Sequence, residues 1–261
     1  MELNLQEKVV AITGGSSGIG LETALEFARE GAWVAICGRS EAKLAQAEEM
    51  FKAEGLKVET LSADISKRDG ITAFADFVVE RFGRMDVWVN NAGAGLSKSI
   101  EAFTDEEMDK LIDTNFKSAY WGCAAASAHM KGHGGVILNV TSFGAKMPRV
   151  FGGMYSATKI AVESITKSFA AELAPYGIRV VSILPGLIET PMTEGRVALN
   201  RDELTRCISS HQLGRPEHIA KPMVFLASEA AEYITGVSVE ISGGKYSVQD
   251  PWKAWESVEN V

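Results

Sequence analysis

Residues 9–20 of the chain read Val-Val-Ala-Ile-Thr-Gly-Gly-Ser-Ser-Gly-Ile-Gly and lead into an apolar-periodic stretch, Leu21 to Arg29. The β-branched run predicts a strand, the glycines predict a tight turn and the periodic stretch predicts a helix. Glycine lets the backbone approach a pyrophosphate closely, and the start of a helix offers free N–H groups and a positive dipole end. The order strand, turn and helix therefore favours dinucleotide binding over an ordinary glycine-rich turn.

Outward from this stretch, short β-branched runs alternate with longer amphipathic stretches, a pattern typical of parallel strands joined by crossover helices. The seven predicted strands are Val9–Ile12, Trp33–Cys37, Val58–Leu61, Val87–Asn90, Val136–Val140, Arg179–Leu184 and Val237–Ile241. Helices are expected to begin near Ile19, Glu41, Ile71, Asp105, Tyr155 and Glu217, and several to end at Gly31, Gly55, Gly83 and Gly177. The sequence thus predicts an α/β fold: a Rossmann-type, doubly wound, seven-stranded parallel sheet with helices on both faces.

The length of 261 residues fits a single dinucleotide-binding domain spanning residues 1–261. Two segments fall outside the alternation of strands and helices. Residues 186–213 follow a predicted strand, and because ligands of open α/β sheets bind at the carboxyl ends of strands, this segment is expected to be a substrate lid. The tail at about 246–261 is open to three interpretations: it covers a pocket, covers a neighbouring subunit, or is disordered.

Charge and composition exclude several classes of partner. The formal net charge of −8, with no basic patch, argues against nucleic acid. The first residues lack a signal-peptide pattern, and no apolar run approaches the roughly 18 residues of a membrane span. We therefore expect a cytoplasmic protein with no membrane partner. Cys37, Cys123 and Cys207 are far apart, and a helix holding His129 and His133 should end at the following glycines, so no disulfide framework and no metal site are expected.

A basic residue follows the second predicted strand, in Gly38-Arg39-Ser40. At this place an acidic residue normally holds the ribose 2′-hydroxyl of NAD, whereas a basic residue accepts the 2′-phosphate of NADP. Arg39 can form a bidentate, charge-assisted pair with phosphate. The sequence therefore favours NADP, with NAD as the other cofactor left open and a solvated surface arginine as the alternative interpretation.

Three further motifs join the glycine turn. They are Asn90-Asn91-Ala92-Gly93 at a strand end, Ser142 just past another strand, and Tyr155-Ser156-Ala157-Thr158-Lys159, which places a phenol and an ammonium one helical turn apart. Each is uninformative alone. Together, in this order and spacing, they make the sequence resemble the short-chain dehydrogenase/reductase family from Val9 to about Gly244.

The resemblance implies a catalytic set of Asn115, Ser142, Tyr155 and Lys159. A phenol with a pKa near ~10 is a poor base at neutral pH, and a nearby ammonium favours its ionised form. In the reducing direction Tyr155 would donate a proton to a carbonyl oxygen that Ser142 also binds, while a hydride arrives at the carbonyl carbon. Asn115 would hold a water that links Lys159 to solvent.

The glycine turn and the resemblance together imply a cofactor cleft. Some NADP-using members of the family carry a basic residue where this chain has Ser17, so Arg39 stands alone as the NADP signal. Lys159 is expected on the nicotinamide ribose. The expected cofactor-binding residues are Gly14, Ser16, Ser17, Gly18, Ile19, Gly20, Arg39, Asp64, Ile65, Asn91, Ala92, Gly93, Tyr155, Lys159, Pro185, Gly186, Ile188 and Thr190.

By the same resemblance, a mostly apolar lining indicates a small, neutral, apolar ketone or secondary alcohol as substrate. The residues expected there are Ala94, Gly95, Leu96, Phe143, Met147, Phe151, Met154, Leu187 and Met192, with Lys98, Lys146 and Arg149 close by in sequence. Small residues along the helix at Tyr155 and the family's habits imply a homotetramer or homodimer. The alternatives are a non-catalytic cofactor-binding redox sensor or scaffold, and epimerisation or dehydration on the same scaffold.

Overall fold

A computed structural model describes residues 2–259 and shows a seven-stranded sheet in the order β3-β2-β1-β4-β5-β6-β7. Every pair of neighbouring strands is parallel. The predicted Rossmann-type, doubly wound sheet is confirmed. The strands are β1 (Val9–Thr13), β2 (Trp33–Gly38), β3 (Glu59–Ser62), β4 (Val87–Asn90), β5 (Gly135–Val140), β6 (Ile178–Pro185) and β7 (Ser238–Ile241).

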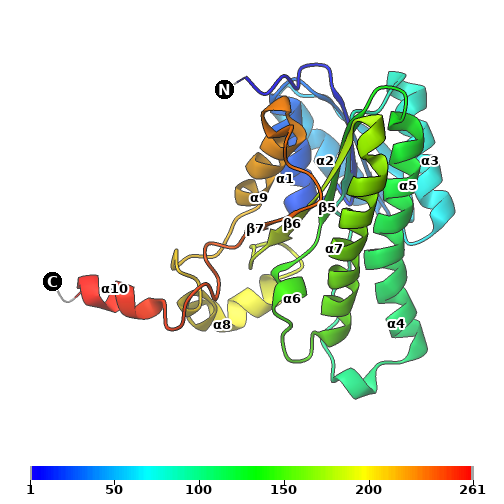
Figure 1. The fold of residues 1–261 in the computed structure, drawn as a ribbon. Coiled ribbons are helices and arrows are strands. Elements are labelled where there is room, and N and C mark those ends of the chain that lie inside the picture. Colours follow the sequence, from blue (N-terminus) through cyan, green and yellow to red (C-terminus); the bar gives the residue numbers. More distant parts are fainter. Residues whose placement is uncertain (1, 260–261) are drawn as a thin grey trace.

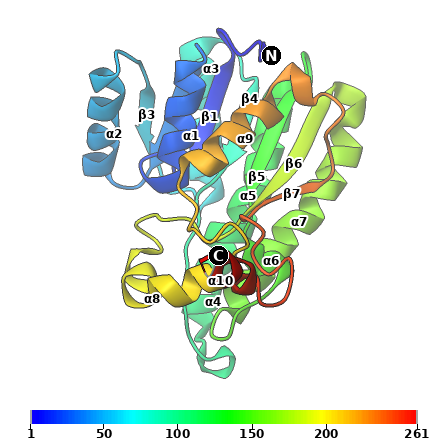
Figure 2. The ribbon, with the colours of Figure 1, turned by 90° about the vertical axis from the view of Figure 1, so that its left-hand side faces the viewer.

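Helices cover both faces of the sheet (Figure 1). Helices α1, α2 and α9 pack on one face and α3, α5 and α7 on the other (Figures 1 and 2). The α-helices are α1 (Gly18–Arg29), α2 (Glu41–Ala53), α3 (Arg68–Phe82), α4 (Asp105–Leu111), α5 (Ser118–Met130), α6 (Phe143–Lys146), α7 (Gly153–Leu173), α8 (Glu194–Arg206), α9 (Glu217–Ala227) and α10 (Trp252–Glu259).

Predicted strand bounds and helix starts agree with the structure within two residues, with one exception. Helix α3 begins at Arg68 rather than near Ile71, because its first turn is polar and carries no apolar signal. The single helix expected from Asp105 is three elements in succession, with a π-helix, Ile112–Lys117, between α4 and α5.

Two hydrophobic cores, one on each face of the sheet, hold the strands. All five residues of β1 are buried, as expected for a central parallel strand covered on both faces. On one face Trp88 is fully buried, with its ring 5.4 Å from that of Phe74 in α3. On the other face Ile12 and Ile36 contact α1, α2 and α9. The glycine turn therefore follows a strand whose residues are all buried.

The expected lid segment contains a helix that the sequence did not predict. Helix α8 is largely polar, and its two buried residues, Val197 and Leu204, are seven apart, which leaves little periodic signal. They pack on Leu187, Ile208 and Leu213, which form a small separate core. Figures 1 and 2 show α8 beyond the carboxyl ends of the strands.

The described part of the tail contains a helix. After a turn it forms α10, which extends away from the body beside α8 (Figure 1). The indole of Trp255 donates a hydrogen bond to the Ser209 oxygen over 3.0 Å, and the Arg206 guanidinium stacks on Trp252 at 4.7 Å. Residues 260 and 261 of the tail lie outside the described residues.

His129 and His133, at which the sequence predicts no metal site, contact ordinary protein groups. His129 lies 3.3 Å from Asp76, and His133 contacts the Met85 carbonyl oxygen at 2.9 Å. Over residues 2–259 no cluster of three His, Cys, Asp or Glu side chains is arranged to hold a metal. Among the helices of that same range, none combines the length and apolar character needed to cross a membrane.

Candidate active site

The glycine turn packs directly against the end of β4. Gly14 and Gly18 have φ angles of +65° and +56°, which favour glycine. A Cβ on Gly20 would lie 2.3 Å from Asn91 Nδ2 and 2.4 Å from the Gly14 oxygen, so no side chain fits there. Asn91 Nδ2 donates to the oxygens of Thr13 and Gly14 over 3.1 and 3.0 Å. Asn91 thus fixes the shape of the turn.

Helix α1 presents its amino end to the space above this turn. Ser17 stands at the N-cap in extended conformation, and its hydroxyl makes no capping hydrogen bond. The first N–H groups of α1 therefore remain available to an anion, which the helix dipole also attracts. This end of the site suits the pyrophosphate of a dinucleotide.

A cavity of about 1130 Å³ runs along the carboxyl ends of the strands, where the strand order reverses between β1 and β4. Every residue predicted for cofactor binding lines it except Gly20, which lies behind the turn against Asn91. Of the predicted catalytic set, Ser142, Tyr155 and Lys159 line the cavity and Asn115 does not. The cavity is large enough for a dinucleotide and a small substrate together.

Two basic side chains border the end of the cavity next to β2. Arg39 follows β2, and Lys43, which the sequence reasoning missed, lies in the first turn of α2. The sequence feature that could have identified Lys43 is its position three residues after Ser40, the N-cap residue of α2. The Ser40 hydroxyl accepts a hydrogen bond from the Lys43 N–H. Neither cation makes a hydrogen bond or ion pair with another residue of the described chain. Both are therefore free to bind an anion.

Asp64 lies at the same end of the cavity. Its carboxylate accepts hydrogen bonds from the hydroxyl and the N–H of Ser66 over 2.8 and 3.1 Å. These bonds, assisted by the charges of Arg39 and Lys67, lower the pKa of Asp64, so it is ionised at neutral pH. A carboxylate held in one orientation can accept a hydrogen bond from an adenine amino group.

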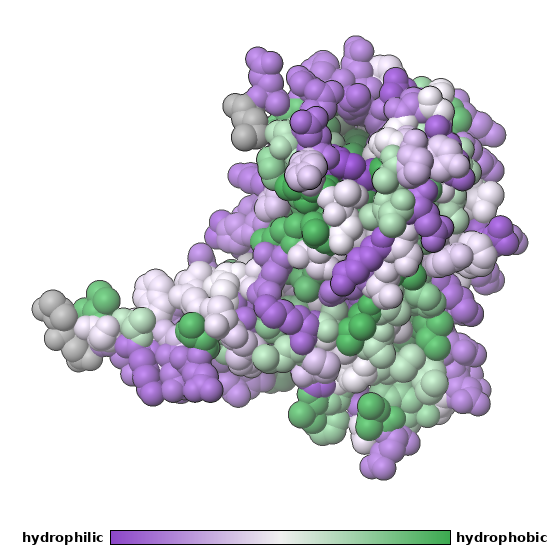
Figure 3. Space-filling model, in the orientation of Figure 1, coloured by the Kyte–Doolittle hydropathy of each residue, from purple (hydrophilic) through white to green (hydrophobic). Residues whose placement is uncertain are grey.

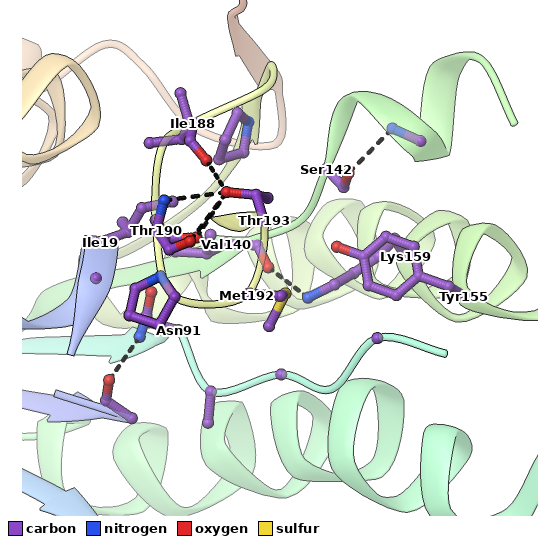
Figure 4. Close-up of a pocket in the computed structure, with 18 of the residues that line it drawn as sticks. Ile19, Asn91, Val140, Ser142, Tyr155, Lys159, Ile188, Thr190, Met192 and Thr193 are labelled. Carbon is purple, nitrogen blue, oxygen red and sulfur yellow. Dashed lines mark hydrogen bonds between the residues drawn. The ribbon is translucent and has the colours of Figure 1, made fainter. Parts of the chain in front are cut away.

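Tyr155 and Lys159 project from one face of α7 toward the cavity, with Ser142 facing them from the end of β5 (Figure 4). Burial raises the pKa of the Tyr155 phenol, while hydrogen bonding to Ser142 and the positive charge of Arg149 act in the opposite direction. Ser142 also accepts from the Gly144 N–H over 3.0 Å, which fixes its hydroxyl at the start of α6. The phenol is therefore protonated at neutral pH and can donate a proton.

Lys159 is only 4% exposed, and its ammonium donates to the Val140 carbonyl oxygen over 2.9 Å. Burial lowers the pKa of Lys159 to about 8. The ammonium lies 5.8 Å from the centre of the Tyr155 ring. It therefore retains its charge at neutral pH and stands close enough to stabilise a phenolate.

Asn115 lies behind the cavity, in the π-helix. Its Oδ1 accepts from the Ala94 N–H over 2.7 Å, and its Nδ2 donates to the Ala94 oxygen and to Thr158 Oγ1 over 2.9 and 3.2 Å. A Cβ on Gly93 would lie 3.4 Å from Asn115 Oδ1 and 3.5 Å from Lys159 Nζ. Asn115 thus ties the loop after β4 to α7. Its expected role in holding a water stays a prediction.

The segment after β6 closes the cavity over the glycine turn. Thr193, another residue that sequence reasoning missed, accepts from the Thr190 N–H over 3.0 Å and donates to the Ile188 oxygen over 2.6 Å (Figure 4). A Cβ on Gly18 would lie 3.3 Å from Thr190 Cγ2, so the segment rests on the turn. Pro185 and Gly186 line the same side.

The substrate end of the cavity is open and bordered by apolar side chains. Met147 and Met192 line it and are 47% and 61% exposed. Hydrophobic surface also gathers at the lower end of the molecule, over the loop between α6 and α7 (Figure 3). The residues Gly95, Leu96, Phe143 and Leu187 line the cavity as expected. Three residues expected there do not line it: Ala94, Phe151 and Met154.

The fold and this cleft define a nicotinamide-dependent oxidoreductase. Residues 8–200 match the family model described as short chain dehydrogenase. The chain is 37% identical to the 3-oxoacyl-[acyl-carrier-protein] reductase FabG of Thermotoga maritima, with 93% of this chain and 99% of the relative covered. It is also 37% identical to the L-rhamnose 1-dehydrogenase (NAD(P)(+)) of Azotobacter vinelandii, with 93% and 98% covered.

A solved structure agrees. The crystal structure of a short-chain type dehydrogenase/reductase from Mycobacterium marinum superposes with a TM-score of 0.89 at 31% identity, covering 94% of this chain and 98% of that one. The chain belongs to the short-chain dehydrogenase/reductase family, whose members act on CH–OH or carbonyl groups with NAD(P).

Proposed function

We propose that this protein is an NADP-preferring carbonyl reductase in which Tyr155 is the proton donor. The observation that carries the proposal is the meeting of Ser142, Tyr155 and Lys159 at one end of a cavity whose other end holds Arg39. A pure cofactor-binding protein would need neither a phenol nor a serine hydroxyl where a carbonyl oxygen would lie.

Each side chain has a chemical task in this proposal. NADPH, when bound, supplies the hydride. Tyr155 donates its proton to the carbonyl oxygen, and Ser142 donates a hydrogen bond to that oxygen as negative charge develops on it. The Lys159 ammonium binds the nicotinamide ribose and lowers the free energy of the phenolate that Tyr155 leaves behind. Asn115 is a positioning residue for Tyr155 and Lys159, through its hydrogen bonds to Ala94 and Thr158.

The preference for NADP rests on charge. Arg39 and Lys43 border the cavity beside β2 without an ion-pair partner in residues 2–259, and a 2′-phosphate would supply one. Ser16 lines the same place and offers a hydroxyl. No acidic side chain directly follows β2 to hold a 2′-hydroxyl. If NADP is the cofactor, reduction of a carbonyl group is the expected direction of the reaction. The carbonyl carbon would lie among apolar side chains.

Assembly and location are also part of this proposal. We infer a cytoplasmic homotetramer or homodimer that pairs through α7, whose outer side combines small residues with a 46% exposed Ile160. Ala157, Ser164, Ser168 and Ala171 are exposed on this helix and would let a second helix approach closely. Light scattering after gel filtration would test the oligomeric state, and an Ile160→Glu variant that stays assembled would contradict this interface.

The test of the activity is the loss of nicotinamide absorbance during incubation with a panel of ketones and aldehydes. NADPH and NADH are each supplied to the wild-type protein. We expect turnover of a carbonyl compound, faster with NADPH. Tight NADPH binding without turnover of any compound would contradict a reductase and favour a non-catalytic sensor.

A further inference from the structure

Two arginines from separate segments line the substrate end of the cavity. Arg149 lies in the loop between α6 and α7, and Arg196 lies in the first turns of α8. Neither guanidinium group makes a hydrogen bond or an ion pair with another residue in the 2–259 range. The one acidic side chain among the residues that line the cavity, Asp64, lies beside Arg39 at the far end. The substrate end therefore carries uncompensated positive charge.

The two guanidinium groups act on each other. The pKa of Arg149 is lowered, first by burial and then by the positive charge of Arg196. Arg149 also acts electrostatically on the Tyr155 phenol, so it lies near the reacting end of the cavity. Two like charges held near one another cost free energy that a bound anion would relieve.

Neighbouring cations differ from this pair because each has a partner. Lys98 binds Glu107 over 2.7 Å and Lys146 binds Glu240 over 2.6 Å. Arg201, five residues beyond Arg196 in α8, forms an ion pair with Glu189. Lys245 lines the cavity, and its ammonium contacts Cys207 Sγ at 3.2 Å. Among these neighbours, Lys98, Lys146 and Arg201 have an acidic partner, whereas Arg149, Arg196 and Lys245 have none within residues 2–259.

We propose that the substrate carries a carboxylate that Arg149 and Arg196 bind while its carbonyl group faces Tyr155. Planar guanidinium groups pair with carboxylates through two parallel hydrogen bonds. Apolar side chains that line the same cavity, such as Met147 and Met192, would contact the carbon chain. The substrate class is then a keto acid or aldehyde acid, with a hydroxy acid as product, instead of the neutral compound expected from the sequence.

This inference rests on the proposed function, and a binding experiment separates the two. Octanoate and octanamide have the same chain length and neither is reduced. Their affinities for the wild-type protein saturated with NADP⁺ are measured by calorimetry at low ionic strength. We expect octanoate to bind at least about tenfold more tightly than octanamide, and Arg149→Gln and Arg196→Gln each to weaken octanoate binding by about tenfold.

The matched control is Lys146→Gln, which removes the same charge from a neighbouring, ion-paired side chain that does not line the cavity. It should leave both affinities unchanged. The NADP⁺ affinity of the two arginine variants should also equal that of the wild type. Equal binding of octanoate and octanamide by the wild type would overturn the proposal, and so would a loss of NADP⁺ affinity in place of octanoate affinity.

Turnover gives the second readout. With NADPH, the wild type should reduce 5-oxohexanoate with a kcat/KM at least about tenfold above that for its methyl ester, and the double variant should lose this preference. If neither compound nor any other carbonyl is reduced, the proposed function fails, and octanoate binding still decides the anion site. If the ester is reduced equally well in every variant, the anion site fails and the reductase stands.

Discussion

The Lys159 ammonium lies 5.8 Å from the centre of the Tyr155 ring and donates a hydrogen bond to the Val140 oxygen. The two side chains share a helix face, so their spacing is set by α7 itself. Burial lowers the pKa of Lys159 to about 8, whereas burial raises the pKa of Tyr155. The charge of Lys159 is therefore the quantity that changes first when the pH rises above neutral.

The first prediction concerns pH. Below its pKa of about 8, Lys159 is charged and can bind the cofactor ribose, and above that pH it becomes neutral. The kcat/KM for NADPH, which reports groups of the free enzyme, should therefore fall as the pH rises through about 8. Lys159→Arg keeps its charge to higher pH, so its fall should move upward even if its activity is lower. A wild-type profile that stays flat well above this pH would contradict the assignment.

The second prediction concerns stability. The pKa of Lys159 is depressed in the folded protein, so the unfolded chain binds this proton more tightly and the buried charge opposes folding at neutral pH. Each unit of pKa shift corresponds to ~1.4 kcal/mol, and Lys159→Met also leaves the Val140 oxygen without its hydrogen-bond donor, at a cost of roughly 1–3 kcal/mol. The net effect of this variant should be a rise in the free energy of unfolding at neutral pH by on the order of 1–2 kcal/mol. Activity should be lost.

The gain should shrink as the pH rises from about 8 toward the 10.5 of a free lysine, because the wild-type side chain then becomes neutral as well. Lys167→Met, on the exposed side of the same helix, is the control and should show no such pH-dependent gain. Denaturant unfolding at neutral pH and at a pH of about 10 measures the free energy of unfolding of both variants and of the wild type. A Lys159→Met variant less stable than the wild type at neutral pH would show that burial of the charge is not the dominant cost.

The third prediction concerns the cofactor. Arg39→Asp removes the phosphate partner and places a carboxylate where it repels a 2′-phosphate and can accept from a 2′-hydroxyl. The ratio of kcat/KM for NADPH to that for NADH should fall by at least about tenfold, the loss expected for one charged hydrogen-bond partner. Arg39→Gln should give an intermediate ratio. The same ratio in all three proteins would mean that Arg39 is only a solvated surface residue.

Local patterns explain why much of the fold and site could be predicted from the sequence. The turn from Thr13 to Gly20 is contiguous, and close contacts to Ala92 and Asn91 require glycine at positions 14 and 20. Tyr155 and Lys159 are four residues apart on one helix, so their proximity follows from helix geometry. The buried strands are continuous apolar runs, which periodicity and length identify.

Other features depend on contacts between distant segments and left no local signal. Arg196 lies in a polar helix whose buried residues are Val197 and Leu204, and it lines the same cavity as Arg149 although the two are far apart in sequence. The π-helix around Asn115 reflects hydrogen bonds to Ala94 and Thr158, which are distant in sequence. The sequence predicts a neutral substrate from residue types near the motifs, and residue types alone do not show which cations have acidic partners.

The fourth prediction concerns the glycine turn. Gly20→Ala places a Cβ within 2.3 Å of Asn91 Nδ2 and 2.4 Å of the Gly14 oxygen, so the turn or the end of β4 must shift. Overpacking of this kind costs roughly 1–3 kcal/mol, and NADPH affinity should fall as well. Gly132→Ala is the control, since a Cβ there meets no atom within 4 Å. Equal melting temperatures and NADPH affinities for the two variants would contradict the close packing of turn and strand.

The most direct test of the catalytic proposal compares the wild type with Tyr155→Phe, which removes one hydroxyl and keeps the ring. With NADPH and a reducible carbonyl compound, the variant should lose about 10²–10⁴-fold in kcat/KM, the contribution of a positioned general acid. Its affinity for NADPH, measured by fluorescence, should be unchanged, because the glycine turn, Arg39 and Lys159 remain in place. A Tyr155→Phe variant that binds NADPH and reduces the same compound at the wild-type rate would contradict Tyr155 as the proton donor.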